Sequence, residues 1–247
     1  MFAGPNGSGK SIIKHAVPPQ LLGIYVNPDD IEKQMRDTGG VLNFDDFGIN
    51  TSKEEFETYL SDANRANKRD LIINYAGLKW NQNKVSLNQS GLNSYAGSVL
   101  AEFIRAKLMT NSISFSTETV MSHKSKVELL RDAQAAGYRT YLYYIATDDP
   151  EINCFRVKQR VLKGGHSVAE NKIRERYQRS LDLVRDAIRF SNRAYFFDNS
   201  FGERQIDDMW VAEVTEGKSL LLKQESIPQW FVTSVWNKLD KSSRIQD

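Results

Sequence analysis

Near the start of the chain stands the sequence Gly4-Pro5-Asn6-Gly7-Ser8-Gly9-Lys10-Ser11, which matches the pattern G-x-x-x-x-G-K-[ST] at every defined position. Glycines in such a loop let backbone N–H groups turn toward phosphate oxygens, the lysine reaches the terminal phosphates, and the hydroxyl of the last residue ligates Mg²⁺. The alternative is a Gly/Ser turn that fits the pattern by chance. Because Ile12 to Ala16 can continue as a helix, we predict a loop that binds ATP and Mg²⁺ and extends from Gly4 to Ser11.

The rest of the chain alternates short apolar runs with helical patterns. Buried strands are predicted at Ile24 to Val26, Ile113 to Phe115, Thr140 to Ile145 and Ala194 to Phe197. Helices are predicted at Ser98 to Met109, Lys124 to Ala136, Pro150 to Leu162 and Asn171 to Phe190. This alternation favours an α/β fold, a parallel sheet of the P-loop NTPase or kinase type sandwiched by helices. Only three residues precede Gly4, so the first strand is expected to be short.

Two segments depart from this pattern, and both are assigned to a single kinase domain over residues 1–247. Residues from about 40 to 92 are polar and rich in asparagine, with one convincing helix near Lys53 to Ala63, and are predicted to be an insertion. From about residue 202 to 247 the chain is predicted to form an appendage. It consists of a hairpin at Trp210 to Lys223 and an aromatic-rich helix with Trp230, Phe231 and Trp236.

Three carboxylates lie at the ends of two predicted strands, where open α/β sheets build their sites. Asp29 and Asp30 come after Asn27-Pro28, and Glu118 lies in Phe115 to Thr119. A carboxylate at such a position can orient an attacking hydroxyl and accept its proton. Asp29 and Asp30 also suit a helix start, where acids favour the dipole. Glu118 can face Mg²⁺ or the acceptor, or it is a residue that enters a helix.

Arginines cluster on two predicted helices separated by Lys163-Gly164-Gly165-His166. Arg156 and Arg160 lie four residues apart on the first helix, and Arg174, Arg176 and Arg179 lie on the second. A lid with this spacing can close over phosphates and stabilise charge that develops on the transferred group. The alternative is a solvated basic helix face.

The overall composition excludes several classes of protein. With 33 Lys and Arg against 31 Asp and Glu, the formal charge of +2 provides no field for holding nucleic acid or an anionic membrane. The single cysteine, Cys154, is expected to be a buried helix residue, and one thiol is compatible with a reducing compartment. Since there is also no apolar run of membrane-spanning length, we predict a cytoplasmic protein.

Together these residues resemble the zeta-toxin family of P-loop kinases. The resemblance rests on Phe2 to Ser11, Asn27 to Ile31, Phe115 to Ser122, Asp149 to Arg179 and Phe197 to Ser200. It implies that Lys10 and Ser11 occupy the phosphate and Mg²⁺ positions, that Asp29 is the catalytic base, and that Glu118 is an acidic residue of the active site. Arg160 would contact phosphate. Arg156 is predicted to bind ATP from its place among the lid arginines.

The resemblance also implies an ATP-dependent kinase that phosphorylates a hydroxyl of a small molecule, with UDP-N-acetylglucosamine as the first candidate acceptor. An antitoxin protein is a candidate partner. Two alternatives stay open: an ATP-binding module or degenerate paralogue without kinase activity, and a polynucleotide kinase. The second would require a basic groove with stacking aromatics, which the near-neutral charge disfavours.

Overall fold

The computed structural model describes residues 1–61, 78–88, 92–165, 167–202, 204–239 and 244–245. The chain divides into two compact units. The first unit contains Met1–Pro18 and Glu118–Asp247, and the second contains Pro19–Thr117. Strand β6 (Phe115–Thr119) contributes residues to both.

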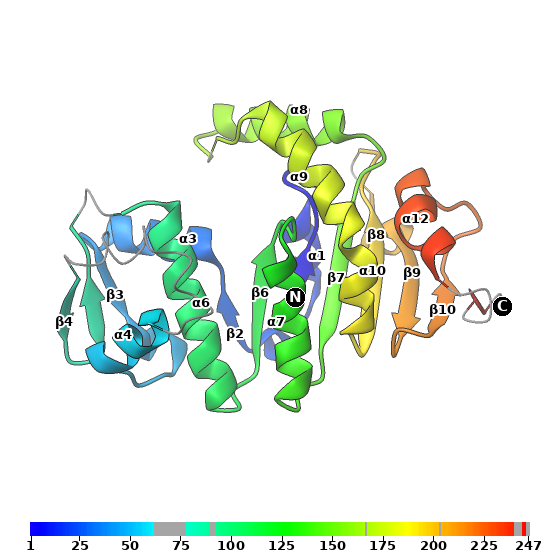
Figure 1. Cartoon of the computed structure of the whole chain (residues 1–247). Coiled ribbons are helices and arrows are strands. Elements are labelled where there is room, and N and C mark those ends of the chain that lie inside the picture. The colour runs from blue at the N-terminus through cyan, green and yellow to red at the C-terminus, as the bar shows by residue number, and fades with distance from the viewer. Residues whose placement is uncertain (62–77, 89–91, 166, 203, 240–243, 246–247) are drawn as a thin grey trace. The chain divides into compact units, whose positions relative to one another are not determined.

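The first unit is built on a mostly parallel sheet (Figure 1). Its strands, besides the last two residues of β6, are β1 (Phe2–Ala3), β7 (Tyr141–Ala146), β8 (Arg193–Asp198), β9 (Trp210–Thr215), β10 (Ser219–Leu222) and β11 (Arg244–Ile245). Its helices are α1 (Lys10–Ala16), α7 (Lys124–Ala135), α8 (Pro150–Leu162), α9 (Glu170–Asp182), α10 (Val184–Arg189), α11 (Ile206–Met209), α12 (Gln229–Ser234) and the 3₁₀-helix η4 (Trp236–Lys238).

Strand β1 is short but central in this sheet. It pairs in parallel with β7 on one side and with the end of β6 on the other. Strand β8 continues the parallel arrangement beyond β7, and β9 and β10 then follow as antiparallel neighbours. The loop that leaves β1 therefore begins at the carboxyl end of a strand flanked on both sides, where parallel α/β sheets bind ligands.

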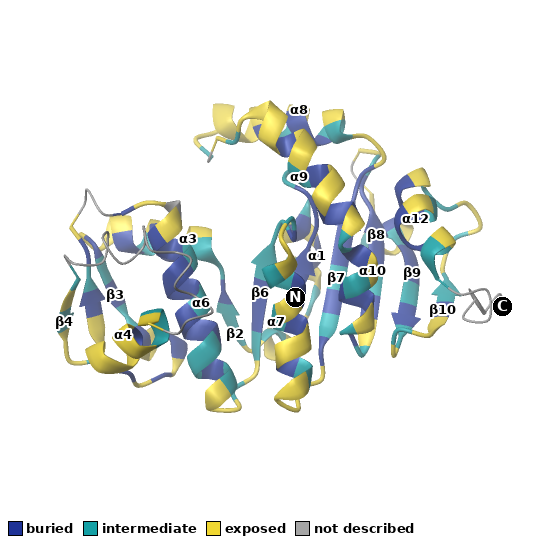
Figure 2. Cartoon of the chain, in the orientation of Figure 1, coloured by how far each residue is buried: buried dark blue, intermediate teal, exposed yellow. Residues whose placement is uncertain are grey.

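Apolar side chains from the strands and helices form one core in this unit. In the first four residues of β7, the buried Leu142 and Tyr144 alternate with the more exposed Tyr141 and Tyr143, and the two buried residues pack with Leu181 of α9 and Phe231 of α12. Strands β7 and β8 are largely buried, whereas the helices carry both buried and exposed faces (Figure 2). The period of two along β7 matches a sheet whose faces are covered to different extents.

The second unit has its own core and a second, smaller sheet. Its elements are α2 (Pro19–Leu22), β2 (Ile24–Val26), α3 (Pro28–Asp37), β3 (Val41–Asn43), the 3₁₀-helix η1 (Phe44–Phe47), α4 (Lys53–Ser61), β4 (Lys79–Asn81), β5 (Lys84–Ser86), α6 (Ser94–Thr110) and the first three residues of β6. Strand β2 pairs in parallel with β6, and β3, β5 and β4 form an antiparallel sheet. Phe103 of α6 packs edge-on against Phe44 and Phe56 at the centre of the core.

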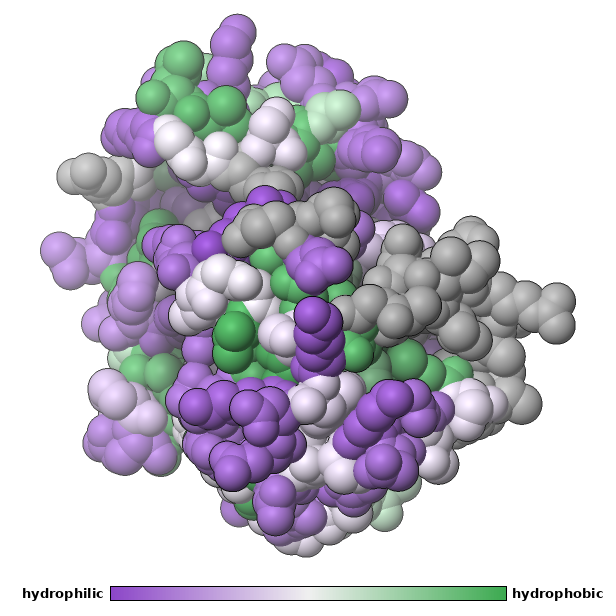
Figure 3. Space-filling model, turned by 90° about the vertical axis from the view of Figure 1, so that its left-hand side faces the viewer, coloured by the Kyte–Doolittle hydropathy of each residue, from purple (hydrophilic) through white to green (hydrophobic). Residues whose placement is uncertain are grey.

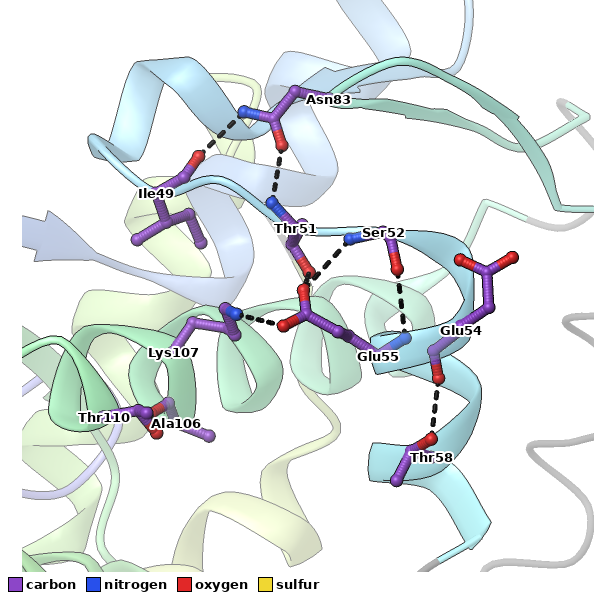
Figure 4. A network of polar contacts seen from close by, with 10 residues as sticks. All are labelled: Ile49, Thr51, Ser52, Glu54, Glu55, Thr58, Asn83, Ala106, Lys107 and Thr110. Atoms are coloured by element: carbon purple, nitrogen blue, oxygen red, sulfur yellow. Dashed lines mark hydrogen bonds and ion pairs between the residues drawn. The ribbon is translucent and has the colours of Figure 1, made fainter.

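A polar network fixes the start of α4 (Figure 4). The Glu55 carboxylate accepts hydrogen bonds from the Thr51 hydroxyl at 2.9 Å, from the Ser52 N–H at 3.1 Å and from Lys107 Nζ of α6 at 2.8 Å. Asn83, in the turn between β4 and β5, accepts from the Thr51 N–H and donates to the Ile49 carbonyl. Helix α4 is thereby joined to both α6 and the small sheet.

Several predicted elements are confirmed. Helix α8 has the predicted bounds, with Asp149 as its N-cap and Pro150 at its first position. Cys154 is buried on this helix. Strand β2 has the predicted bounds, β7 and β8 agree with the prediction to within a residue at each end, and β1 is short. The hairpin turns at Glu216 and Gly217, both of which have positive φ.

Other predictions are wrong in part. The strand expected at Ile113 to Phe115 runs instead from Phe115 to Thr119. The helix expected at Asn171 to Phe190 is two helices, because the chain is interrupted at Leu183. The polar insertion contains the antiparallel sheet β3-β5-β4, which was not predicted. The C-terminal hairpin is not an appendage, since β9 pairs with β8 and extends the main sheet.

Parts of the predicted insertion, including the end of the helix at residues 62 and 63 and residues 89–91, lie outside the described residues.

Hydrophilic side chains surround smaller apolar areas on the face of the second unit shown in Figure 3. Within the described ranges, every helix is too short or too polar to cross a membrane.

Candidate phosphate-binding site

The loop between β1 and α1 wraps around the start of the helix. Gly9 is the N-cap residue of α1 and has φ of 101°, in the left-handed region. The Ser8 N–H donates to the Pro5 carbonyl at 3.2 Å, and the Ile12 N–H donates to the Gly9 carbonyl at 2.9 Å. Consecutive amides near a helix start that turn in this way form a concavity suited to anions.

The Lys10 ammonium group lies over this loop. Nζ donates to the carbonyl oxygens of Gly4 and Pro5, both at 3.1 Å, and lies 3.9 Å from Oε1 of Glu118. The Lys10 side chain is only 9% exposed and that of Glu118 is 24% exposed. A largely buried cation at the rim of an amide-lined loop would attract a phosphate tail.

Two asparagines hold the loop from outside. Asn153 of α8 donates from Nδ2 to the Asn6 carbonyl at 2.6 Å, and Asn199, which follows β8, donates from Nδ2 to the Ser8 carbonyl at 2.7 Å. Both residues are buried. The motif search predicted neither role. Asn199 lies in a stretch that carries the family resemblance, but nothing in the sequence indicated a contact with the loop.

Glycine is required where these asparagines approach. A methyl group on Gly7 would lie 2.7 Å from the Asn153 carbonyl oxygen, and one on Gly9 would lie 2.4 Å from Asn199 Nδ2. Both distances are shorter than a carbon atom can accept, and both glycines have positive φ. The glycines of the motif therefore serve the close approach of the bracing residues as well as the turn itself.

Two polar atoms of the loop are buried without a hydrogen-bond partner in the described part of the chain, Oδ1 of Asn6 and Oγ of Ser8. Buried polar atoms are rarely left unpaired in folded proteins, and exceptions concentrate at functional sites. The loop thus has hydrogen-bonding capacity that the protein itself does not use.

The metal position predicted at Ser11 lies on the first turn of α1, where the residue is exposed. Across the described residues there is no cluster of three or more His, Cys, Asp or Glu side chains able to hold a metal ion. A Mg²⁺ ion at Ser11 would take its other ligands from phosphate oxygens and water, as is usual for Mg²⁺ bound with nucleotides.

The predicted lid arginines have different surroundings. Arg156 donates to the carbonyl oxygens of Asn199 at 2.8 Å and Phe201 at 3.3 Å. Partial burial lowers the pKa of its guanidinium, and the nearby Asp198 carboxylate opposes that shift. Arg160 is exposed near the end of α8, and its side chain lies against Gly165.

Two of the predicted lid arginines on α9 form surface ion pairs. Arg174 pairs with Glu151 at 2.6 Å and with Glu170 at 3.0 Å, and these two carboxylates raise the pKa of the guanidinium. Arg179 pairs with Glu175 at 3.2 Å. His166, which was noted beside the glycines, lies outside the described residues.

Asp29 and Asp30 belong to the second unit, where they are exposed in the first turn of α3. The Asn27 side chain caps this helix by accepting from the Asp29 N–H at 3.1 Å. This confirms the predicted helix start. The role of Asp29 as catalytic base stays a prediction.

A second polar network surrounds the end of β8. The buried Asp198 carboxylate accepts from Trp230 Nε1 at 3.0 Å and from the Ser200 hydroxyl at 2.6 Å. Asp148 accepts from the Trp230 N–H at 2.9 Å. Helix α12 is therefore attached to the strand ends that carry Asn199.

Comparisons with known proteins agree with this architecture. The family model described as zeta toxin matches residues 64–200, which is more than half of the chain. An uncharacterized protein of Haemophilus influenzae (strain ATCC 51907 / DSM 11121 / KW20 / Rd) is 37% identical over 65 residues, covering 26% of this chain and 46% of that protein.

Among solved structures, the complex of AvrRxo1-ORF1 with AvrRxo1-ORF2 crystallised with sulphate ions is similar, with a TM-score of 0.53 and 14% sequence identity. The similarity covers 97% of this chain and 64% of that one. This chain therefore spans less than two thirds of the length of the Haemophilus protein and less than two thirds of the length of the matched AvrRxo1 chain. The fold is that of a P-loop kinase, and the extent of the family match shows that the chain belongs to the zeta toxin family.

Proposed function

We propose that the protein is an ATP-dependent phosphotransferase that moves the γ-phosphoryl group of ATP to a hydroxyl of a small molecule. The observation that carries this proposal is the geometry of the loop from Gly4 to Ser11. The buried Lys10 ammonium lies over the carbonyls of Gly4 and Pro5, next to turned backbone amides. Such a loop binds the phosphates of a nucleotide.

ATP fits the hydrogen-bonding capacity of this loop. The Ser8 hydroxyl, buried without a hydrogen-bond partner among the described residues, can donate to a phosphate oxygen. Lys10 would clamp the terminal phosphates, and the Ser11 hydroxyl would hold Mg²⁺ together with phosphate oxygens. Mg²⁺ would neutralise charge on the β- and γ-phosphates. Glu118, whose carboxylate is 3.9 Å from Lys10 Nζ, is proposed to orient that ammonium group and the acceptor.

In the proposed chemical step, Asp29 acts as the base. Its carboxylate would take the proton of the acceptor hydroxyl, the freed oxygen would attack the γ-phosphorus, and the bond to the bridging oxygen would break to release ADP. Arg160 would steady the negative charge on the transferred group. The family resemblance supports both roles, because Asp29 falls where the family has its catalytic base and Arg160 corresponds, across a gap in the lid, to a phosphate-contacting arginine.

A nucleotide sugar such as UDP-N-acetylglucosamine is the acceptor that we propose, again from the family resemblance. We further propose a cytoplasmic location and an antitoxin-like protein partner. AvrRxo1-ORF1 is found in a complex with AvrRxo1-ORF2. Co-purification of a tagged form of this chain with the product of an adjacent small gene would test the partner.

The proposed function is tested by a phosphate-transfer assay with ATP and Mg²⁺ against a panel of nucleotide sugars, comparing Asp29→Asn with the matched control Asp30→Asn. Loss of the base is expected to lower kcat by about 10²- to 10⁴-fold while the affinity for ATP is retained. The control should act nearly as the wild type, because Asp30 is only a neighbouring acid on the same exposed helix turn.

The same assay separates the alternatives. Equal rates for wild type and Asp29→Asn would remove Asp29 as the base. ATP binding without transfer to any acceptor would favour the non-catalytic module. A single-stranded oligonucleotide with a free hydroxyl belongs in the panel, since its phosphorylation in place of the sugars would identify a polynucleotide kinase.

A further inference from the structure

Two asparagine side chains, here called the braces, reach the phosphate loop from other parts of the first unit. We propose that Asn153 and Asn199 are positioning residues that set the direction of two loop peptides, so that the N–H groups of Gly7 and Gly9 face the phosphates. The inference rests on the proposed function, since it assumes that the loop binds a phosphate tail.

Peptide geometry links each of these carbonyls to the N–H of the next residue. A trans peptide unit is planar, and its C=O and N–H bonds point in opposite directions. None of the described peptide bonds is cis. When Asn153 holds the Asn6 carbonyl, it therefore fixes the N–H of Gly7 on the opposite side. In the same way, the bond from Asn199 to the Ser8 carbonyl fixes the N–H of Gly9.

The orientation of the Asn153 amide is itself determined. The hydroxyl of Thr147, the residue after β7, donates to Oδ1 of Asn153 and also lies 3.2 Å from the Asp149 carbonyl oxygen. Nδ2 of Asn153 is then the atom left to bind the loop. Thr147 and Asn153 are both fully buried. Water therefore cannot readily replace either bond, and a rotated amide would leave two buried polar atoms unpaired.

The position of Asn199 is fixed through its backbone. Its N–H donates to the Ala146 carbonyl at 2.9 Å, and its carbonyl accepts from Arg156 at 2.8 Å. Arg156 thus supports the brace of the loop, whereas the sequence had suggested a direct role at the nucleotide. The anchors of the two braces, Thr147 and Ala146, come from adjacent positions at the end of β7.

The loop's own polar side chains do not supply this restraint. Oδ1 of Asn6 and Oγ of Ser8 have no hydrogen-bond partner among the described residues, and glycine supplies no side chain at the two peptides concerned. The side-chain amides of the two braces are the donors that hold the carbonyls of Asn6 and Ser8. They would keep the amide concavity formed before ATP arrives, which lowers the cost of binding.

The test uses the full chain, labelled with ¹⁵N-glycine, and ATP with Mg²⁺ as the probe. Asn153→Leu and Asn199→Leu each remove one donor at similar volume, and Asn171→Leu makes the same change at an exposed asparagine on α9. Each brace variant is expected to bind ATP, and tripolyphosphate as a phosphate-only probe, about tenfold more weakly than wild type. The Asn171 variant should bind both as the wild type does.

The amide resonances add a readout that a general loss of stability would not produce. At saturating ATP, Asn153→Leu should lose the shift of the Gly7 amide and keep that of Gly9, and Asn199→Leu should show the reverse. If a leucine variant does not fold, Thr147→Val provides the test for Gly7 and Arg156→Met the test for Gly9. Each leaves its asparagine in place but removes a group that orients it.

The outcomes separate this inference from the proposed function. Folded brace variants that bind ATP within about twofold of wild type, with both glycine shifts intact, would overturn the inference. A wild-type protein that binds neither ATP nor tripolyphosphate would overturn the proposed function instead.

Discussion

The Lys10 side chain lies folded over the loop that carries it, with its ammonium group on the carbonyls of Gly4 and Pro5 and 3.9 Å from Glu118. The two carbonyl oxygens are weak substitutes for phosphate oxygens, which carry full charge and make stronger hydrogen bonds with an ammonium group. In our proposal the side chain exchanges the two carbonyls for phosphates without leaving the site.

Lys10→Met should therefore remove most of the affinity for ATP. Losing a charge-assisted contact to phosphate costs about 2–4 kcal/mol, which corresponds to at least a thirtyfold rise in Kd. Calorimetric titration measures this rise in Kd directly. Lys14→Met, on the same helix, is the matched control and should bind ATP as wild type does. Equal affinity in the two variants would show that Lys10 does not contact the nucleotide.

At this scale the sequence predicted the loop residues but not the residues that brace them. Lys10 and the loop glycines occur at fixed spacing, because the chemistry of phosphate binding requires them in one continuous stretch. Asn153 and Asn199 are separated from the carbonyls they hold by 147 and 191 residues. An asparagine inside a helix or after a strand has no local signature, so only the folded chain shows this role.

Helix α12 is attached to the end of β8 through Trp230 and the buried Asp198 carboxylate. Trp230→Phe removes the indole N–H and leaves a buried charge with one partner fewer. We expect the free energy of unfolding to fall by about 1.5–3 kcal/mol, measured by urea denaturation. A loss below about 0.5 kcal/mol would mean that the contact adds little to the attachment of this helix.

The network at the start of α4 should make stability depend on acid pH (Figure 4). Hydrogen bonds from Lys107 and Thr51 lower the pKa of Glu55 from the ordinary value of 4.5. A group with a depressed pKa contributes stability above its unfolded pKa and loses that contribution as pH falls through the folded value.

Glu55→Gln should thus reduce the free energy of unfolding by at most about 1 kcal/mol at neutral pH, because the carboxylate is half exposed and screened by water. The difference from wild type should shrink between neutral pH and a pH well below the ordinary pKa of 4.5. Denaturant titrations at both pH values measure it. A difference that grows on acidification would give the effect the wrong sign and exclude the ion pair as its source.

Elements were predictable where local signals were strong. Asp149 and Pro150 mark the start of α8, and Gly137, with φ of 84°, follows the end of α7. The sheet β3-β5-β4 had no such signal, since its strands have three residues each and β3 is distant in sequence from its partner β5. Stacking of Trp80 on Phe44 supports this sheet, and that contact exists only after folding.

Each of the two units has its own hydrophobic core. Phe103 in the second unit is 2% exposed and packs against Phe44 and Phe56. Phe103→Ala should lower the free energy of unfolding by about 3–5 kcal/mol through the cavity that it leaves. Under conditions where the variant is folded, ATP affinity should be unchanged, because the loop and its braces belong to the first unit. A matching loss of ATP affinity would show that the loop depends on the second core.

At the scale of the whole chain, the alternation of strands and helices was sufficient to predict an α/β fold with a mostly parallel sheet. The division into two units was not predicted, because one of its two boundaries lies within the continuous strand β6. The extension of the sheet by β9 and β10 was also missed. A hairpin pattern indicates which strands pair with each other but not which sheet they join.

The central claim is that backbone amides of the loop bind the phosphates of ATP. The chain has 15 glycines, so ¹⁵N-glycine labelling yields a simple spectrum in which the loop amides can be followed. Addition of ATP with Mg²⁺ should shift the amide resonances of Gly7 and Gly9 strongly and leave those of Gly48 and Gly217 in place. Saturating ATP that leaves both loop amides unmoved would contradict the account.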